Sequence, residues 1–212
     1  MPSGRRIFVG DIQGCRQELE SLLARCEFRP GTDRILPVGD LVNKGPDSHG
    51  VVRLLIEHGA ESVLGNHDLW WLAKRRFKDQ ALHDWLAAQP VVRIHADRIQ
   101  VHAGLHPAWT EAHLAKLHGS EVEYATNVRY CTADGTRPAA DWPPPSPPFR
   151  PWDEYYRGKK PVVCGHWARR GLVRTANVIS LDTGCCYGGK LSAWIAEEDR
   201  IVQVPSTMPR LE

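Results

Sequence analysis

Residues 62–68, Ser-Val-Leu-Gly-Asn-His-Asp, join a short apolar run to a cluster of polar side chains. The run predicts a buried strand, and the Leu-Trp-Trp-Leu that follows predicts a helix over residues 69–77. Asn66 and His67 would then lie at a strand-to-helix turn, where an amide oxygen and an imidazole can bind a metal ion. The same cluster is also an ordinary helix N-cap, so the interpretation depends on what the other strand ends carry.

Five apolar runs in the chain end in the same way, with glycine beside a side chain that can bind metal. Glycine lets the backbone bend there. A mixture of carboxylates, imidazoles and amides suits Mn²⁺, Fe²⁺ or Zn²⁺ better than copper or an iron–sulfur cluster. Two such ions about 3.5–4 Å apart can clamp a phosphoryl oxygen and lower the pKa of a bound water. The candidate ligands are Asp11 with Gln13, Asp40, Asn66 with His67, His102, and His166.

The turns that carry the candidate ligands must be positioned by strands and helices. In the first part of the chain strands alternate with helices, and after Pro90 most of the predicted elements are strands. Predicted strands at 6–9, 34–38 and 62–64 alternate with helices at 15–26, 51–56, 69–77 and 81–88. After Pro90 we expect a hairpin of residues 91–95 and 98–102, a helix over 110–117, and strands at 161–164, 178–181, 191–196 and 201–204. The proline-rich residues 138–151 are predicted to form an ordered surface loop. This order predicts an α/β protein with two packed sheets and outer helices, in one domain spanning residues 1–212.

Composition narrows the class of protein. The 212 residues are 42% hydrophobic and 25% charged, with a formal net charge of +2, which argues neither for nucleic acid nor for a membrane. No apolar run is long enough to span a bilayer, and the N-terminal residues do not resemble a signal peptide, so we expect a cytoplasmic protein. None of the six cysteines forms a CxxC pair, which predicts free thiols.

With these residues in hand, the chain resembles the calcineurin-like metallophosphoesterases of the phosphoprotein phosphatase group. Within that group it is similar to the bacterial ApaH family, the symmetrical diadenosine tetraphosphatases. The resemblance covers nearly the whole chain. The motifs are Gly-Asp-Ile-Gln-Gly-Cys at 10–15, Gly-Asp-Leu-Val-Asn-Lys-Gly-Pro at 39–46, Gly-Asn-His-Asp at 65–68, His-Ala-Gly at 102–104, Gly-His-Trp at 165–167 and Leu-Asp-Thr-Gly-Cys-Cys-Tyr-Gly-Gly at 181–189.

The resemblance implies a β-sandwich between helical layers and two divalent metal ions. Manganese is the family's usual metal, with iron, zinc, cobalt or magnesium as alternatives. A metal-bound hydroxide would split diadenosine tetraphosphate into two ADP, and a related activity on dinucleoside-polyphosphate caps of RNA is also implied. Neither a membrane nor an obligate protein partner is expected. The implied roles are Asp11 and Gln13 on the first metal, Asp40 bridging both, Asn66, His102 and His166 on the second, His67 as general acid beside Asn43, and Lys44 and Arg129 on phosphate.

The chain departs from the wider superfamily at three of these positions. Gln13 stands where histidine is usual and is a weaker, neutral ligand for the first metal. Asn43 and Lys44 stand where Asp-Arg is usual. We expect Asn43 to accept a hydrogen bond from His67 but to stabilise an imidazolium less than a carboxylate would. Lys44 lacks the bidentate fork of arginine.

The chain is also shorter than typical ApaH proteins. The deficit lies after Trp71 and between Ala108 and Ala125, which predicts a reduced helical cap over the substrate cleft and a wider range of substrates. Aromatic side chains could stack on a base there. Tyr187, in a glycine-rich loop, is the first candidate; the others are Trp70, Trp71, Trp109, Trp142 and Trp167.

Two other functions remain open from the residues alone. One is a serine/threonine protein phosphatase or a general phosphomonoesterase, which would release phosphate from a phosphopeptide. The other is an inactive module that binds nucleotide or RNA. The presence of His67, His102 and His166 argues against an inactive protein, because pure binding requires none of them.

Overall fold

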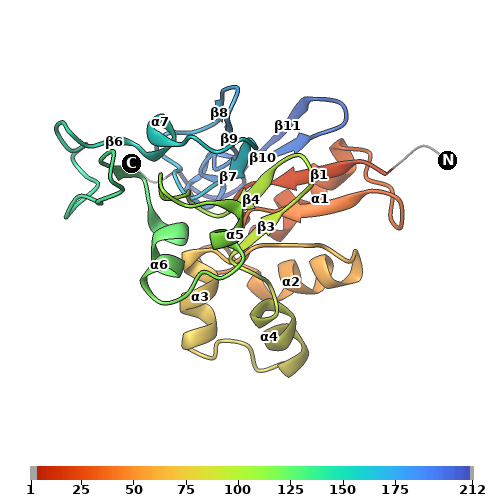
Figure 1. Cartoon of the computed structure of the whole chain (residues 1–212). Coiled ribbons are helices and arrows are strands. Elements are labelled where there is room, and N and C mark those ends of the chain that lie inside the picture. Colours follow the sequence, from red (N-terminus) through yellow and green to blue (C-terminus); the bar gives the residue numbers. More distant parts are fainter. Residues whose placement is uncertain (1–3, 211–212) are drawn as a thin grey trace.

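Two β-sheets pack face to face in the computed structural model, which describes residues 4–210 (Figure 1). The first sheet has the strand order β11-β10-β1-β2. Strands β1 and β2 are parallel, whereas β10 is antiparallel to both of its neighbours. The strand bounds are Arg6–Val9 for β1, Arg34–Pro37 for β2, Lys190–Ile195 for β10 and Arg200–Pro205 for β11.

The second sheet has the order β3-β4-β7-β9-β8. Strands β4, β7 and β9 are parallel, and the antiparallel β3–β4 pair confirms the predicted hairpin. The bounds are Val92–Ile94 for β3, Ile99–Val101 for β4, Val162–Cys164 for β7, Val173–Arg174 for β8 and Val178–Ser180 for β9. A separate two-stranded pair joins β5 (Tyr130–Cys131) to β6 (Arg150–Pro151), so the end of the predicted surface loop forms a short strand.

Successive side chains of a strand point to opposite faces of its sheet, and this divides the core into layers. Phe8 faces inward, and with Leu36, Val163 and Ile179 it forms the apolar layer between the two sheets. Its neighbours Ile7 and Val9 point to the opposite side, as side chains on a strand must. There they pack in a second cluster with residues of the helices α1 (Arg16–Arg25) and α2 (Ser48–Glu57). A third cluster covers the outer face of the second sheet.

Helices surround the sheets, and α2, α3 and α4 form a group at the bottom of Figure 1. Within the described residues, no helix combines the length and apolar character that crossing a membrane requires. The helices are α1 (Arg16–Arg25), α2 (Ser48–Glu57), α3 (Asn66–Ala73), α4 (Gln80–Ala87), α5 (Glu111–Leu114), α6 (Ser120–Asn127), α7 (Trp152–Tyr155) and the single 3₁₀ turn η1 (Cys185–Tyr187). The sequence had not predicted α6, and α5 is shorter than the predicted 110–117.

The predicted strand at residues 62–64 is wrong, and Pro37 explains why. This segment runs beside β2, with Glu61 N donating to the Ile35 carbonyl at 3.0 Å. A parallel ladder would next require the nitrogen at position 37 to donate back to Glu61, but proline has no N–H. The Gln100 side chain takes this place, because its Nε2 donates to the carbonyls of both Pro37 (2.7 Å) and Glu61 (3.2 Å).

Helix α3 begins three residues earlier than the predicted 69–77. The buried Asp68 carboxylate accepts hydrogen bonds from Gly65 N at 2.9 Å and from Leu41 N at 2.8 Å. A third-position carboxylate that bonds back to the residue before the helix fixes the first turn. Asn66 and His67 are therefore the first two residues of α3 rather than part of a preceding turn.

Candidate metal centre

The predicted ligands meet at one edge of the sandwich, because parallel strands deliver their carboxyl ends to the same side. Asp11 follows β1, Asp40 follows β2, His102 follows β4 and His166 follows β7. Asp11, Asp40 and His102 each offer a ligand atom, and these atoms lie within 4.8 Å of one another. Asp182, which follows β9, completes the ring of strand ends.

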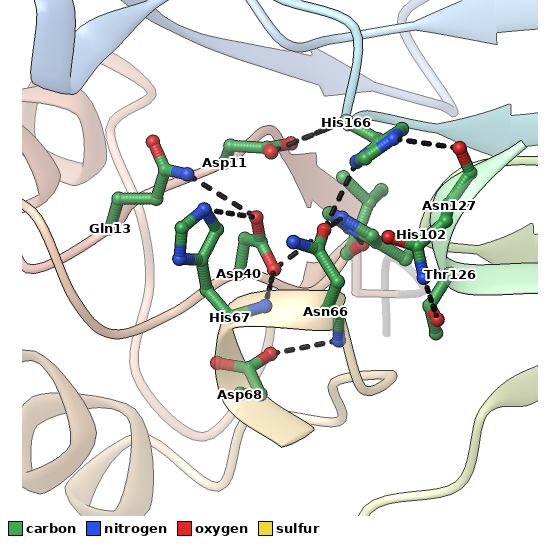
Figure 2. A network of polar contacts seen from close by, with 12 residues as sticks. Asp11, Gln13, Asp40, Asn66, His67, Asp68, His102, Thr126, Asn127 and His166 are labelled. Carbon is green, nitrogen blue, oxygen red and sulfur yellow. Dashed lines mark hydrogen bonds and ion pairs between the residues drawn. The ribbon is translucent and has the colours of Figure 1, made fainter. Parts of the chain in front are cut away.

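The oxygen of Asn66 is the point on which two imidazoles converge (Figure 2). Asn66 Oδ1 lies 3.1 Å from His102 Nε2 and 3.1 Å from His166 Nδ1. His102 Nε2 also lies 3.4 Å from Asp40 Oδ1. Separations of about 3 Å are those of neighbouring ligand atoms around one ion that binds each at about 2.1 Å.

Both imidazoles present a lone pair to this point. His102 Nδ1 lies 2.9 Å from the Val38 carbonyl, and His166 Nε2 lies 3.1 Å from the Asn127 carbonyl. A carbonyl only accepts, so these nitrogens carry the ring protons. Burial lowers the pKa of His102 to about 4 and that of His166 well below its usual value. The other ring nitrogens, His102 Nε2 and His166 Nδ1, are therefore acceptors, and both face a third acceptor, Asn66 Oδ1. A cation between these three atoms would stabilise the arrangement.

Four buried carboxylates concentrate negative charge around the same point. Burial raises the pKa of Asp40 to about 6, of Asp182 to about 6 and of Asp68 to about 8. Burial, and then the charges of Asp182 and Asp40, raise the pKa of Asp11 well above its usual value. Ionised carboxylates this close together need positive charge beside them. The donor set therefore fits divalent metal ions.

The backbone bends sharply at the strand ends. Gly165 and Gly65 allow the closest approaches, since a Cβ at Gly165 would lie 2.0 Å from Asp11 Oδ1 and one at Gly65 would lie 2.1 Å from Asp40 Oδ1. Positive φ angles, which are unfavourable for residues other than glycine, gather here and mark a functional constraint. Five of the eight such residues within 4–210 belong to the candidate site: Gln13, Asp40, Asn43, Lys44 and His166.

Gln13 turns its amide nitrogen, not its oxygen, toward the cluster. Its Nε2 donates to Asp40 Oδ2 at 3.2 Å, and its Oε1 accepts a hydrogen bond from the Cys186 thiol. In this orientation the side chain holds the Asp40 carboxylate through its nitrogen, and its oxygen faces Cys186.

Asn43 donates to His67, contrary to the expectation that it accepts. The backbone N–H of Lys44 donates to Asn43 Oδ1 at 2.9 Å, which fixes the amide so that Nδ2 faces His67 Nδ1 at 2.7 Å. His67 Nδ1 is thus an acceptor, and the ring proton lies on Nε2, 3.9 Å from Asp40 Oδ2. Burial lowers the pKa of His67.

Two clefts open from Asn66 and His67. The larger, about 1150 Å³, is lined by residues that include Arg129, Trp142 and Tyr187, and the smaller, about 560 Å³, is lined by residues that include Trp70. Arg129 donates to Asp141 at 3.0 Å and to the His166 carbonyl at 3.4 Å. Lys44 is exposed beside His67. Trp167 lines the larger cleft, whereas Trp71 and Trp109 pack against the apolar clusters.

Three residues that shape the centre had no assigned role at the level of sequence. Asp182 follows the same pattern of an apolar run, an acidic residue and a nearby glycine, so this pattern could have identified it. Asp68 caps α3, and Asn127 holds His166 through its carbonyl. A backbone contact of this kind leaves no signal in residue type.

Comparison with known proteins agrees with this geometry. The sequence matches the family described as calcineurin-like phosphoesterase over residues 4–170. The chain belongs to this family of hydrolases, and the αββα fold implied by the resemblance is confirmed.

Individual relatives and solved structures show which members of the family the chain is similar to. The "Bis(5'-nucleosyl)-tetraphosphatase, symmetrical" of Dechloromonas aromatica is 34% identical over 259 residues, covering 92% of this chain and 94% of the relative. A solved structure assigned provisionally as a diadenosine tetraphosphatase is 39% identical, with a TM-score of 0.84, covering 97% of this chain and 95% of that one. A serine/threonine phosphatase from Saccharomyces cerevisiae, 14% identical with a TM-score of 0.57 over 100% of this chain and 82% of its own, shares the fold alone.

Proposed function

We propose that this protein hydrolyses dinucleoside polyphosphates symmetrically, splitting diadenosine tetraphosphate into two ADP. The observation that carries the proposal is the convergence of His102, His166 and Asn66 beside Asp40, in a chain whose relatives are named for that reaction. Divalent ions belong to the family's chemistry. We further propose that there are two and that manganese is the natural metal.

The roles follow from where each side chain lies. Asn66, His102 and His166 would hold one ion and Asp11 the other, and Asp40 would serve both. We keep Gln13 in the first-metal set, where it would bind through its oxygen after its amide turns over. When bound, the two ions supply a water of lowered pKa and positive charge for the transferred phosphoryl group.

The substrate is held and its leaving group stabilised by the chain's own side chains. Arg129 and Lys44 supply positive charge for the phosphates, and Tyr187 lines the larger cleft. His67 Nε2 lies 3.9 Å from Asp40 Oδ2. The imidazolium form of His67 would act as the general acid, whereas the neutral ring would donate a hydrogen bond from Nε2 to the leaving oxygen. The leaving group here is a terminal phosphate whose second pKa is about 6. It needs less proton donation than the alkoxide of a serine ester, which favours anhydrides over phosphoproteins.

The proposal extends to the domain, the range of substrates and the location of the protein. We take residues 1–212 as one domain with a reduced helical cap; the aligned stretch of 259 residues exceeds the 212 of this chain, so the relative contains segments without counterpart here. A smaller cap would also admit the capped end of an RNA. The six cysteines are all buried free thiols, as predicted, which supports a cytoplasmic location.

Product analysis tests the proposal. The purified protein with Mn²⁺ should convert diadenosine tetraphosphate into ADP alone, chelator should abolish turnover, and a phosphopeptide should release little phosphate. His67→Asn should lower kcat about tenfold or more while manganese binding persists. His83→Asn, a histidine of α4 outside both clefts, should keep full activity. ATP and AMP as products would refute symmetrical cleavage, and full activity of His67→Asn would refute the acid.

A further inference from the structure

Each of the two clefts that meet at His67 carries one exposed tryptophan. Trp142, in the larger cleft, is 62% exposed, and Trp70, in the smaller one, is 41% exposed. Among residues 4–210, five large apolar side chains are at least 36% exposed, and these two are the aromatic ones. Large indole surfaces left in water beside a reaction centre indicate contact with a ligand.

Helix geometry ties Trp70 to the centre. It lies four residues after Asn66 and three after His67 on α3, so the three side chains share one face, with Trp70 one turn further along, about 6 Å. The next residue, Trp71, faces the other way and packs on Phe77 with ring centroids 5.7 Å apart. Core packing therefore uses Trp71 and leaves Trp70 free, apart from Arg76, whose Cζ lies 5.1 Å from its ring centroid.

An ion pair next to Trp142 connects its loop to the centre. The preceding residue, Asp141, binds Arg129 Nη1 at 3.0 Å, and Arg129 reaches the His166 carbonyl. This contact anchors the proline-rich loop next to the metal ligands. The Arg169 guanidinium lies over the Trp142 ring, 4.2 Å from its centroid, which fixes the orientation of the indole while most of the residue stays exposed.

We propose that Trp70 and Trp142 are the stacking platforms for the two bases of a dinucleoside polyphosphate, one on each side of the reacting phosphates. The inference rests on the proposed function and deepens it. A substrate cut at its middle has a nucleoside at both ends, and the protein offers two clefts, each with one platform, that share Asn66 and His67. Stacking tolerates any base, so adenine and guanine dinucleotides should both bind.

Binding and turnover of single variants test the two platforms. Trp70→Ala and Trp142→Ala should each lower kcat/KM for diadenosine tetraphosphate about tenfold, chiefly through KM, and the double variant should lose the product of both factors. Phenylalanine at either position keeps a ring and should restore most of the loss. Leu172→Ala removes an apolar side chain that is 39% exposed outside both clefts and should change nothing.

Calorimetric titration with ADP and with pyrophosphate in Mn²⁺ separates the base from the phosphates. The alanine variants should bind ADP more weakly and pyrophosphate as tightly as the wild-type protein does. Equal loss for both ligands, or no loss for ADP, would overturn the platforms. A wild-type protein that shows tryptophan-dependent ADP binding but does not cleave diadenosine tetraphosphate would refute the proposed function and leave the platforms standing.

Discussion

Asn43 and His67 form a pair in which the amide donates to the imidazole. A carboxylate at this position would accept from Nδ1 and favour a charged ring, whereas Asn43, fixed by the Lys44 N–H, favours the neutral ring with its proton on Nε2. Such a ring is a good hydrogen-bond donor and a weak acid. It suits a leaving phosphate, which departs as a stable anion.

Asn43→Asp should therefore change the preference for leaving groups. We expect the ratio of activity on an alkyl phosphate monoester to activity on diadenosine tetraphosphate to rise about tenfold, since general acid catalysis matters more for an alkoxide. Steady-state rates on both substrates give the ratio. Asn43→Ala, which removes the contact without adding charge, is the matched control and should not raise it. An unchanged ratio in Asn43→Asp would show that this pair does not set the leaving-group preference.

Sequence could indicate which side chains meet but not how their amides are turned. The strand ends bearing Asp11, Asp40, His102 and His166 were identifiable because the pattern of apolar run and turn is local. The donor role of Asn43 was not, because it depends on one backbone N–H. The same holds for Gln13, whose orientation is fixed by Cys186, 173 residues away in the chain.

At the scale of elements, glycines at the strand ends allow the candidate ligands to approach one another closely. Gly165 N donates to the His102 carbonyl at 2.7 Å and joins the ends of β7 and β4. Its α-hydrogen faces Asp11, where a Cβ would lie 2.0 Å from Oδ1. Gly165, at the end of β7, thus positions two candidate ligands, His102 and Asp11.

Gly165→Ala should displace Asp11 and weaken manganese binding about 10- to 100-fold at the first metal position, with a comparable loss of activity. Manganese titration followed by electron paramagnetic resonance measures the stoichiometry and affinity. Gly171→Ala is the control, because it introduces a Cβ into open space at a φ of +71° and brings only local backbone strain. Two manganese ions bound by Gly165→Ala with unchanged affinity would contradict this role.

The elements also show where pattern reasoning failed. Residues 62–64 have the composition of a strand, yet Pro37 lacks the donor that a ladder requires, and a side chain from the other sheet, Gln100, replaces it. Helix α6 escaped prediction because its sequence, Ser-Glu-Val-Glu-Tyr-Ala-Thr-Asn, has few apolar positions from which a period can be read. The first outcome depends on contacts between elements that lie far apart in the chain, whereas the second reflects a weak local pattern.

At the scale of the whole molecule, one buried carboxylate ties the first sheet to the loop that precedes β2. Asp33 is fully buried and binds the guanidinium groups of Arg5 and Arg29 as well as their backbone N–H groups. Burial opposes the charge of Asp33, but these hydrogen bonds outweigh it and hold the pKa well below its usual value. The carboxylate therefore stabilises the fold while it is ionised.

The contribution of Asp33 should depend on pH with a definite sign. It is fully present above the unfolded-state pKa of about 4 and is lost as the pH falls toward the lower folded value. Asp33→Asn should lower the free energy of unfolding by about 2–4 kcal/mol at pH 7, and the difference from the wild-type protein should shrink below about pH 4. Urea unfolding with chelator present, from pH 7 to pH 2.5, measures this.

Asp97→Asn is the matched control for Asp33→Asn. Asp97 also pairs with an arginine, Arg6, but its side chain is 43% exposed. Solvent screens such a pair, so its loss should cost less than about 1 kcal/mol. An Asp33→Asn effect that stayed constant down to pH 2.5 would show that the charge of Asp33 does not stabilise the fold.

At the scale of the whole molecule, the proposed activity requires strand ends from both sheets to enclose a pair of metal ions. The most direct measurement is anomalous diffraction at the manganese edge from crystals grown with Mn²⁺. It should show two peaks flanking the Asp40 carboxylate, one within ligand distance of Asn66, His102 and His166 and the other beside Asp11. Peaks elsewhere, or none in excess manganese, would contradict it.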